Sequence, residues 1–493
     1  MQHPPYPSDP YEAARWAHTR LRRRLLDGIW RSDLEQRIAE HMGPVRRQGQ
    51  GVPDLSANPY RVTCRELSTL YLSPPVIRHD LEAPAMTDER SAVVLSGLWA
   101  QARRYQTWVI GCREYMLRVH ATEAGELRYR PVAPDMVLAD SPLDTPDVPH
   151  SVAELRPRKH PKSGEWVWTW DYLDVSNPDA PVYRIHEDIN PVGSTSQRFG
   201  ADWSAAYGIG DEYPYRTAEG LPILPYVVHH AERVGDRLWD AYEGQELLEG
   251  SLTLAMLMSF WLHVVKDASW PQRWSINARP AGLELVDSQG NATRQEIVTD
   301  PAVLLVLEQI MEGLQPQVGQ FDPGGDPKAL LEAIEMYGAR LTADAGVSAS
   351  DVATVSNDPR SGYAISLTND GKREAQRRFV SSFRDADERL MATSAILLNR
   401  ATGGTLPESG YSVIYREIPL SVDELRGREE SVMRRKDAGL LSRVAAYQEL
   451  NPGITEEQAR QDLAEIDAED AAEDAAEPPE PEDTTTDQEN DDG

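Results

Sequence analysis

Residues 344–400, DAGVSASDVATVSNDPRSGYAISLTNDGKREAQRRFVSSFRDADERLMATSAILLNR, consist of two halves of opposite character. The first, Gly346 to Gly362, is small, polar and interrupted by proline, which predicts a loop. Asn369 or Asp370 is the expected N-cap of a helix, because apolar residues then recur every three or four positions as far as the stop at Gly403. A helix of about 29 residues would be ~43 Å long. The stretch therefore predicts a loop followed by a long amphipathic helix that supports it.

Further helices are expected upstream of this stretch. Leu238 to Lys266 is apolar nearly all round in its centre, so it must be buried in a large core or between subunits packed in a ring. Its apolar run is too short to span a bilayer. Asp326 followed by Pro327 is an N-cap with a proline at the first helical position, which predicts a helix that leads into the loop. A shorter helix is expected from Pro301 to Gly313.

The N-terminal part changes character near Trp108. Before it, three stretches have helical spacing, namely Tyr11 to His41, Asn58 to Ser73 and Thr87 to Gln106. From Trp108 to Ile189 the period shifts toward two, which predicts strands.

One of these strands carries a row of aromatic side chains. In EWVWTWDYL (165–173), Trp166, Trp168, Trp170 and Tyr172 alternate with other residues and so share one face. Such a row could be a sugar-binding platform. More often it is one side of a sheet packed against a helix or a neighbouring subunit, and this is the expectation here.

The C-terminal part is expected to be helical and then disordered. After Gly410, YSVIYREIPL predicts a strand, and Ser421–Arg435 and Leu440–Leu450 predict helices. Thr455 caps a last helix. From Asp467 the tail is acidic and lacks aromatic residues, which predicts disorder.

Length and composition indicate a large globular protein. A chain of 493 residues suggests about three domains. The net charge of −30 argues against a simple nucleic-acid binder, which needs a basic stripe, although solubility through self-repulsion explains the charge equally well. Cys64 and Cys112 are expected to be reduced core residues, and the N-terminus lacks the apolar core of a signal peptide.

No catalytic motif stands out in the sequence. There is no GxxxxGK[ST] and no GxSxG, and Gly324 to Lys328 is too short to cradle a triphosphate. His229 and His230 lack the spacing of a zinc site and are expected to be structural. We therefore expect a structural or interaction protein rather than an enzyme, with no cofactor and no metal.

Several stretches, in order along the chain, resemble one family. They are ELRYRPVAPDMVLAD (126–140), DTPDVPHSVAELR (144–156), AGVSASDV and DPRSGYAI followed by a long basic helix, and YREIPLSVDELRGREESVMRRKDAGLLSRVAAYQELNPGITEEQARQDLAEIDAE (415–469). The chain is similar in these stretches to the portal (head-to-tail connector) proteins of tailed double-stranded-DNA phages, of the siphovirus type.

The resemblance implies a ring-forming subunit, usually in twelve copies, with a mainly helical α+β portal fold that has a small β-rich part. The implied parts are a disordered N-terminus (1–10), a wing (11–237), stem and clip (238–345), tunnel loop and long helix (346–410), crown-like helices (411–466) and a disordered acidic tail (467–493). The ring would stand at one capsid vertex of the virion, after assembly in the host cytoplasm, as the channel through which DNA is packaged and ejected.

The resemblance also implies partners and site residues. The partners are copies of the chain, the terminase large subunit that hydrolyses ATP, the major capsid and scaffolding proteins, a head-completion or adaptor protein, and double-stranded DNA bound without sequence specificity; a membrane is not among them. The implied tunnel-loop residues are Val347, Ser348, Ser350, Thr354, Ser356, Asn357 and Arg360. The residues implied at a subunit interface or charged belt are Leu257, Phe260, Lys372, Arg373, Arg377 and Arg378.

Other interpretations stay open. The basic run Arg20, Arg22, Arg23 and Arg24 is expected to be a solvated helix face, whereas the portal interpretation makes it a contact with capsid or DNA. A carbohydrate-active enzyme could use the Trp166, Trp168 and Trp170 face, and another phage head assembly protein would share the composition.

Overall fold

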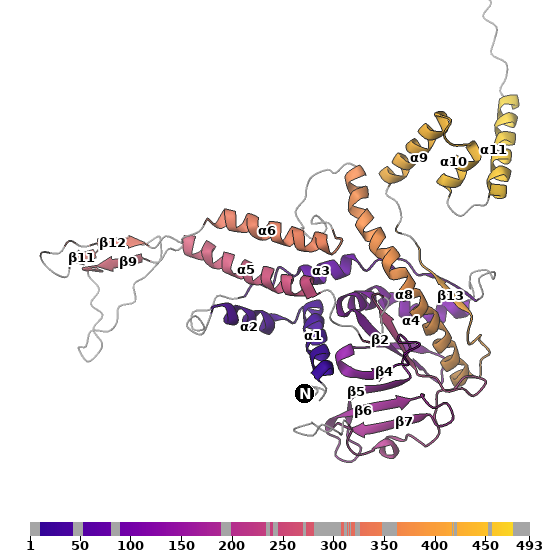
Figure 1. The fold of residues 1–493 in the computed structure, drawn as a ribbon, viewed down its shortest axis with the longest axis horizontal. Coiled ribbons are helices and arrows are strands. Elements are labelled where there is room, and N and C mark those ends of the chain that lie inside the picture. The colour runs from indigo at the N-terminus through magenta and orange to yellow at the C-terminus, as the bar shows by residue number, and fades with distance from the viewer. Residues whose placement is uncertain are drawn as a thin grey trace, which may run out of the picture. The chain divides into compact units, whose positions relative to one another are not determined.

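The computed structural model describes residues 10–42, 53–79, 89–188, 199–232, 237–239, 245–269, 273–280, 307–309, 313, 315, 317–320, 326–347, 362–416, 418, 422–451 and 456–476. The architecture is α+β, as predicted (Figure 1). The chain divides into two compact units. One comprises Met1–Asn357 and Thr368–Ile418, and the other Asp358–Leu367 and Pro419–Gly493.

The strands predicted after Trp108 form two antiparallel sheets. One has the order β3–β2–β8, with β2 at Glu114–Ala121, β3 at Leu127–Val132 and β8 at Tyr226–His230. The other has the order β4–β5–β6–β7, with bounds Val137–Asp140, Ser151–Lys159, Trp166–Asp174 and Val182–Glu187. Short 3-10 turns, η2 (Pro134–Met136) and η3 (Ser204–Tyr207), flank them.

Four helices precede and border the sheets. They are α1 (Pro10–Asp27), α2 (Arg31–Met42), α3 (Pro59–Glu66) and α4 (Glu89–Cys112). The single helix predicted over 11–41 is in fact two, because Gly28 adopts φ +79° and ends the first. The helix α3 is shorter than the predicted 58–73 and begins at Pro59, after the N-cap Asn58, whose side chain accepts from the Arg61 amide.

An antiparallel helix pair follows. It consists of α5 (Gln245–Ser269) and α6 (Pro327–Asp344), and the predicted N-cap Asp326 is confirmed by its bond to the Lys328 amide. Between the two helices the chain makes two small sheets, β9 (Arg273–Ile276) with β12 (Gln317–Gln320), and β10 (Ala278–Pro280) with β11 (Leu307–Gln309). The prediction of a helix over 301–313 is wrong at residues 307–309, which form the strand β11.

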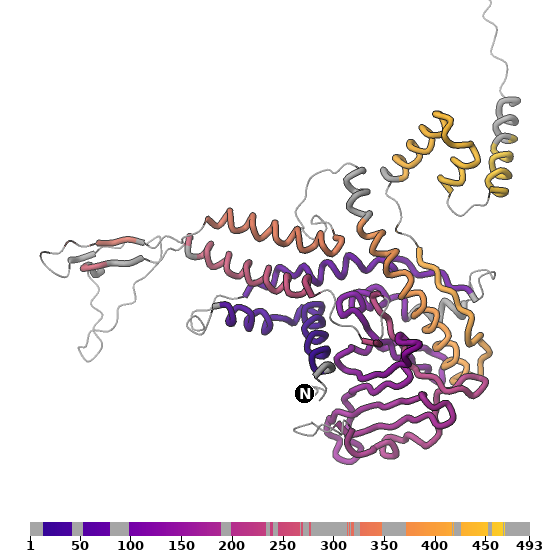
Figure 2. The backbone as a smooth tube through the Cα atoms, in the orientation of Figure 1, coloured from indigo at the N-terminus to yellow at the C-terminus, as the bar shows by residue number. Residues whose placement is uncertain are grey.

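The long helix predicted after Asp370 is α8 (Gly362–Thr402), of 41 residues (Figures 1 and 2). It begins eight residues before the predicted N-cap and ends, as predicted, before Gly403, whose φ is +68°. The next strand, β13 (Tyr411–Ile414), pairs antiparallel with β1 (Val76–His79). This pairing joins two strands that are more than 300 residues apart in the sequence.

The C-terminal unit contains α9 (Val422–Asp437), α10 (Arg443–Leu450) and α11 (Glu456–Ala476). Ser442 caps α10 through the Ala445 amide. The helix α11 continues to Ala476, so the prediction of disorder from Asp467 is wrong for its first ten residues. Residues 477–493, 1–9 and the predicted cap Thr455 lie outside the described residues.

The main hydrophobic core forms around α8. Its predicted apolar face is confirmed, since Phe379, Phe383, Ala386, Leu390 and Leu397 are all 5% exposed or less. They pack with side chains of α1 to α5, β2 and β13. A second core lies under the β4–β7 sheet.

Among the described helices, α5 over Gln245–Lys266 is long and apolar enough to cross a membrane, judged by length and composition only. Its N-terminal half nevertheless packs in the main core through Leu248, Leu252 and Ala255. Helices of this composition serve equally as core helices. Toward its C-terminal end the same helix is only half-buried.

Candidate functional site

The contact between α5 and α6 is tight and defines their antiparallel alignment. A Cβ on Gly250 would lie 2.5 Å from Leu341, and Gly338 faces Leu254. Near the other end, Trp261 Nε1 donates to the Pro327 carbonyl over 2.8 Å. Because the absence of a side chain on Gly250 lets the backbones approach, the pair is a defined element rather than two separate helices.

The backbone just after α6 packs closely against the N-terminal part of α8. Gly346 has φ +78°, and a Cβ on Gly371 would lie 2.5 Å from the Gly346 carbonyl oxygen. Val347 is 1% exposed and belongs to the main core. Its assignment to a DNA-facing loop is therefore wrong, because a buried side chain cannot meet a passing duplex. The other predicted loop residues, Ser348, Ser350, Thr354, Ser356, Asn357 and Arg360, lie outside the described residues.

A cavity of about 960 Å³ lies at this junction, between α3, the end of α4, the start of α5, the end of α6 and the start of α8. Its apolar lining includes Tyr60, Cys64 and Phe379. Its charged lining has both signs and consists of Arg113, Arg377, Arg378, Glu232, Glu246, Asp344 and Glu374. Such a mixed lining suits protein segments better than a strongly charged ligand.

The predicted basic belt at the start of α8 is partly neutralised within the chain. Lys372 Nζ lies 3.1 Å from Glu66 Oε2, and Arg378 Nε lies 3.2 Å from Glu232 Oε1. Arg377 lines the cavity and Arg373 is half-buried. Contacts of these residues with another subunit stay a prediction.

Several large apolar side chains are exposed on the helix pair. Met336 is 72% exposed, and Leu262, Leu330 and Tyr337 are also exposed. Leu257 and Phe260 are half-buried, with Phe260 packed against the main core. If these side chains form one contiguous patch, it is a candidate interaction surface.

The aromatic row of β6 is mostly an internal packing surface. Trp170 is 4% exposed, its ring centroid lies 6.3 Å from that of Trp16 on α1, and its Nε1 donates to Asp188 over 2.8 Å. Phe199 covers the same ring, and only Trp166 is largely exposed. The expected packing of a sheet face against a helix is confirmed, and little of a sugar platform is left.

The basic run of α1 is not the solvated face that its composition predicts. Arg22 is fully buried and Arg20 is 7% exposed. Arg20 and Arg23 both pair with Asp135 in η2, and Arg24 pairs with Asp33. Because α1 packs on η2, these arginines form ion pairs within the chain and do not face solvent as a basic surface.

A buried carboxylate that the sequence did not indicate anchors α8. Asp387 accepts from Tyr71 (2.8 Å), from Tyr415 (2.6 Å) and from His229 Nε2 (2.9 Å). Tyr105 contacts the other nitrogen of that ring at 3.1 Å. His230 donates from Nε2 to the Leu238 carbonyl. The structural role predicted for both histidines is confirmed.

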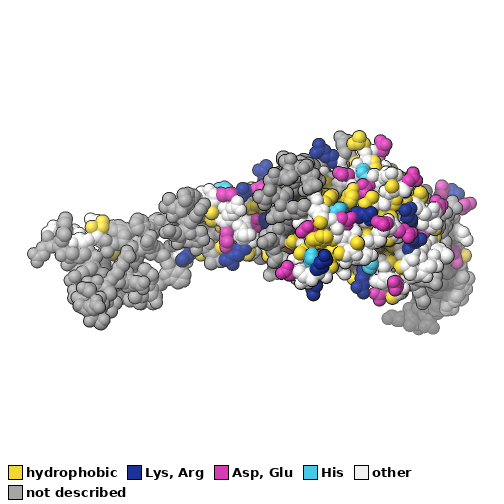
Figure 3. Space-filling model, turned by 90° about the horizontal axis from the view of Figure 1, so that it is seen from below, with side chains coloured by type: hydrophobic (Ala, Val, Ile, Leu, Met, Phe, Trp, Pro, Cys, Tyr) yellow, Lys and Arg dark blue, Asp and Glu magenta, His cyan; other side chains and the backbone are white. Residues whose placement is uncertain are grey.

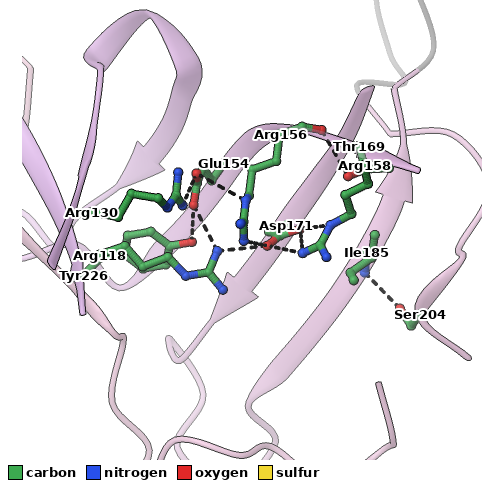
Figure 4. A network of polar contacts seen from close by, with 10 residues as sticks. All are labelled: Arg118, Arg130, Glu154, Arg156, Arg158, Thr169, Asp171, Ile185, Ser204 and Tyr226. Carbon is green, nitrogen blue, oxygen red and sulfur yellow. Dashed lines mark hydrogen bonds and ion pairs between the residues drawn. The ribbon is translucent and has the colours of Figure 1, made fainter. Parts of the chain in front are cut away.

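A second polar network joins the two sheets (Figure 4). Glu154 accepts from Arg118 (3.0 Å), Tyr226 (2.8 Å) and Arg130, and Asp171 accepts from Arg118, Arg156 and Arg158. Burial opposes ionisation of Asp171, but Arg118 and Arg158 outweigh it and lower the pKa of this carboxyl. The alternating arginines Arg156 and Arg158 on β5 were the one sequence signal for this network.

The described residues offer little catalytic chemistry. Burial raises the pKa of the Cys64 thiol to about 12 and also raises that of Cys112, so neither is an activated nucleophile. Both are free, as predicted. No group of three metal-ligating side chains occurs among the described residues.

Comparison with known proteins gives limited results. No family model matches the chain, and no curated protein does. A solved structure titled "Neck of empty GTA particle computed with C6 symmetry" matches with a TM-score of 0.36 and 14% identity, over 80% of this chain and 90% of that one. A similarity of this degree carries no argument for fold or function.

Proposed function

We propose that the chain is a subunit of a phage portal ring, the channel at one capsid vertex through which DNA is packaged and ejected. One observation carries the proposal. The α5–α6 pair is rooted in the core at one end, carries two small sheets at the other, and exposes apolar side chains between them. In this proposal the pair is the stem and the small sheets are the clip.

The remaining parts take their proposed roles from this placement. Residues 11–237 form the wing, the stretch from Val347 to Ser361 crosses from stem to α8 and lines the tunnel beyond its buried first residue, and α9 to α11 form crown-like helices. Neighbouring subunits cover the apolar surface of the stem, through the heterologous contacts that close a ring. Leu257 and Phe260 take part in that cover, and Arg373 and Arg377 form ion pairs across it.

Electrostatics favour a channel over a DNA-binding surface. A duplex that moves must not be gripped, and phosphate contacts grow with the number of available cations. The chain carries a net charge of −30, and on the face in Figure 3 basic and acidic side chains are interspersed. In the proposal, terminase, capsid, scaffolding and adaptor proteins dock on the ring from outside, and the chain itself performs no catalysis.

Solution mass and negative-stain images of the purified chain test this proposal. We expect a ring with a central hole, of a mass equal to many copies of 55.1 kDa. Met336→Asp places a charge on the exposed stem surface without touching the core, so rings should dissociate while the subunit stays folded. Leu143→Asp is the matched control, since Leu143 is 87% exposed on the loop between β4 and β5.

A chain that stays monomeric at micromolar concentration would contradict the proposal, and so would intact rings of the Met336→Asp variant. Phe260→Asp is a weaker test. Phe260 also packs against the core, so its replacement affects folding and assembly together.

A further inference from the structure

The network of Figure 4 holds more positive than negative charge. Four guanidinium groups, of Arg118, Arg130, Arg156 and Arg158, face the carboxylates of Glu154 and Asp171. Both carboxylates are 1% exposed or less, so two positive charges remain unmatched around them. Other charges nearby do not cancel the surplus. Arg128 pairs with Glu126, which leaves no charge over. Arg184 pairs with Asp202 and Asp211, but it neighbours Ile185, the β7 partner of Asp171, and so belongs to the other face of the sheet.

The surplus arginines keep donors directed away from the carboxylates. Among the described residues, Arg130 donates to Glu154 only through Nη2. Arg156 donates to Asp171 through Nη1, and its Nε lies 3.8 Å from Glu154. Arg158 donates to Asp171 through Nε and Nη2. The remaining nitrogens are not among the buried, unsatisfied atoms of the described chain. These side chains are 43%, 30% and 23% exposed, so solvent reaches their free edges.

Holding four guanidinium groups around two acids is unfavourable without a further anion. Like charges a few ångströms apart repel, and an added anion would relieve this repulsion. The strand register brings the groups together. Arg118 is opposite Arg130 on β2 and β3, and Glu154 is opposite Asp171 on β5 and β6. The excess of positive charge therefore follows from the strand register and does not depend on the rotamer of one arginine side chain.

We propose that this arginine cluster is a binding site for a dianionic phosphate group. Guanidinium forks match phosphate oxygens in pairs, and a phosphate monoester carries about −1.5 to −2 charges at pH 7, which balances the surplus. The backbone of a duplex offers one charge per phosphodiester and balances it less well. Inorganic phosphate and the terminal phosphate of a nucleic-acid strand share the required chemistry. This inference does not rest on the proposed portal function.

Calorimetric titration of the full-length protein with inorganic phosphate tests the site, in buffers whose ionic strength is held constant with NaCl. We expect saturable binding and a phosphate-dependent rise in melting temperature. Arg130→Gln and Arg156→Gln each remove one charge and one fork, and should weaken binding at least tenfold. Arg128→Gln is the matched control on the same strand as Arg130, and should bind like the wild type.

Arg130→Lys separates charge from geometry. It retains the charge and loses the fork, so its affinity should lie between those of the wild type and Arg130→Gln. Melting curves without phosphate check that each variant folds. The proposal would be overturned if NaCl at the same ionic strength abolished phosphate binding by the wild type. Equal weakening by Arg128→Gln, or full binding by a folded Arg130→Gln protein, would also overturn it.

A pair of oligonucleotides of one sequence distinguishes the two sources of phosphate. If the terminal phosphate of a strand is the ligand, the 5′-phosphorylated form should displace inorganic phosphate while the 5′-hydroxyl form does not. If neither competes while inorganic phosphate still binds, the site takes the free ion. Displacement by both forms alike would mean that backbone charge is recognised, which contradicts the proposal.

Discussion

Asp387 is the residue on which the attachment of α8 most depends. It accepts hydrogen bonds from Tyr71, Tyr415 and His229 in a fully buried setting. Asp387→Asn keeps the shape but removes the negative charge and replaces one acceptor oxygen with a donor, so the hydrogen bonds made to the carboxylate are weakened. We expect the free energy of unfolding to fall by about 2 kcal/mol, measured by urea titration. The same change at exposed Asp179, on the loop between β6 and β7, should cost under about 0.5 kcal/mol. Equal losses would contradict the assigned role.

His230 makes stability depend on pH. Burial lowers the pKa of this side chain from 6.5 to about 4 in the folded protein. The unfolded chain takes up the proton first, so stability is lost as pH falls from about 6.5 toward 4, by about 3 kcal/mol in all. His230→Asn retains a donor and cannot titrate. We expect the fall in unfolding free energy between pH 7 and pH 5 to be smaller in this variant than in the wild type, and an equal fall would contradict the assignment.

Residue roles were predictable where local context decides them, and not where a distant partner does. The structural role of His229 and His230 follows from the absence of ligand spacing. The ion pairs of Arg20 and Arg23 do not follow from their run, because their shared partner Asp135 comes more than a hundred residues later. The same distance problem concealed Asp387 and the arginine cluster.

At the scale of elements, the α5–α6 contact makes a prediction about two glycines. Alanine normally stabilises a helix by about 1 kcal/mol relative to glycine. At Gly338 a Cβ would meet Leu254 at 3.5 Å, an ordinary contact, so Gly338→Ala should stabilise. At Gly250 the Cβ would lie 2.5 Å from Leu341, and overpacking of about 1–3 kcal/mol should outweigh the gain. Thermal unfolding of the two variants should therefore shift in opposite directions, and shifts of the same sign would contradict the tight contact.

Element boundaries show which sequence signals prevail. Gly362 to Asn369 contains glycine, serine and asparagine, which suggest a loop, yet the helix α8 already includes them. The acidic stretch after Asp467 reads as disordered by composition. Its alanines and glutamates are also strong helix formers, and they extend α11 to Ala476. In both places the continuation of a long helix outweighs the local composition.

For the whole molecule, the α+β class and the order of helices and strands were predictable, whereas strand pairing across the chain was not. No local pattern indicates that β1 pairs with β13, since the partners are more than 300 residues apart in the sequence. The location of the core around α8 was predictable from its apolar periodicity. The dispositions of Ser348 to Arg360, and their proposed role in the tunnel, stay predictions.

Net charge makes a prediction for assembly. Each chain carries −30, so bringing copies together is opposed by repulsion that salt screens within about 10 Å at 0.1 M. If apolar stem surfaces drive association, the oligomer should become more stable as NaCl rises from about 50 to 500 mM. Mass photometry at fixed protein concentration measures this. Dissociation by added salt would instead indicate that ion pairs hold the copies together.

The pairing of β1 with β13 has a consequence for how the protein is made. During synthesis, β1 and the helices around it leave the ribosome long before α8, Tyr415 and β13 exist. The main core cannot close until those last pieces arrive, because Phe379, Phe383 and Asp387 fill its centre. A chain that terminates early leaves that centre empty and its first strand unpaired, and so exposes itself to proteolysis. Completion of translation thus becomes a condition for the chain to fold and survive.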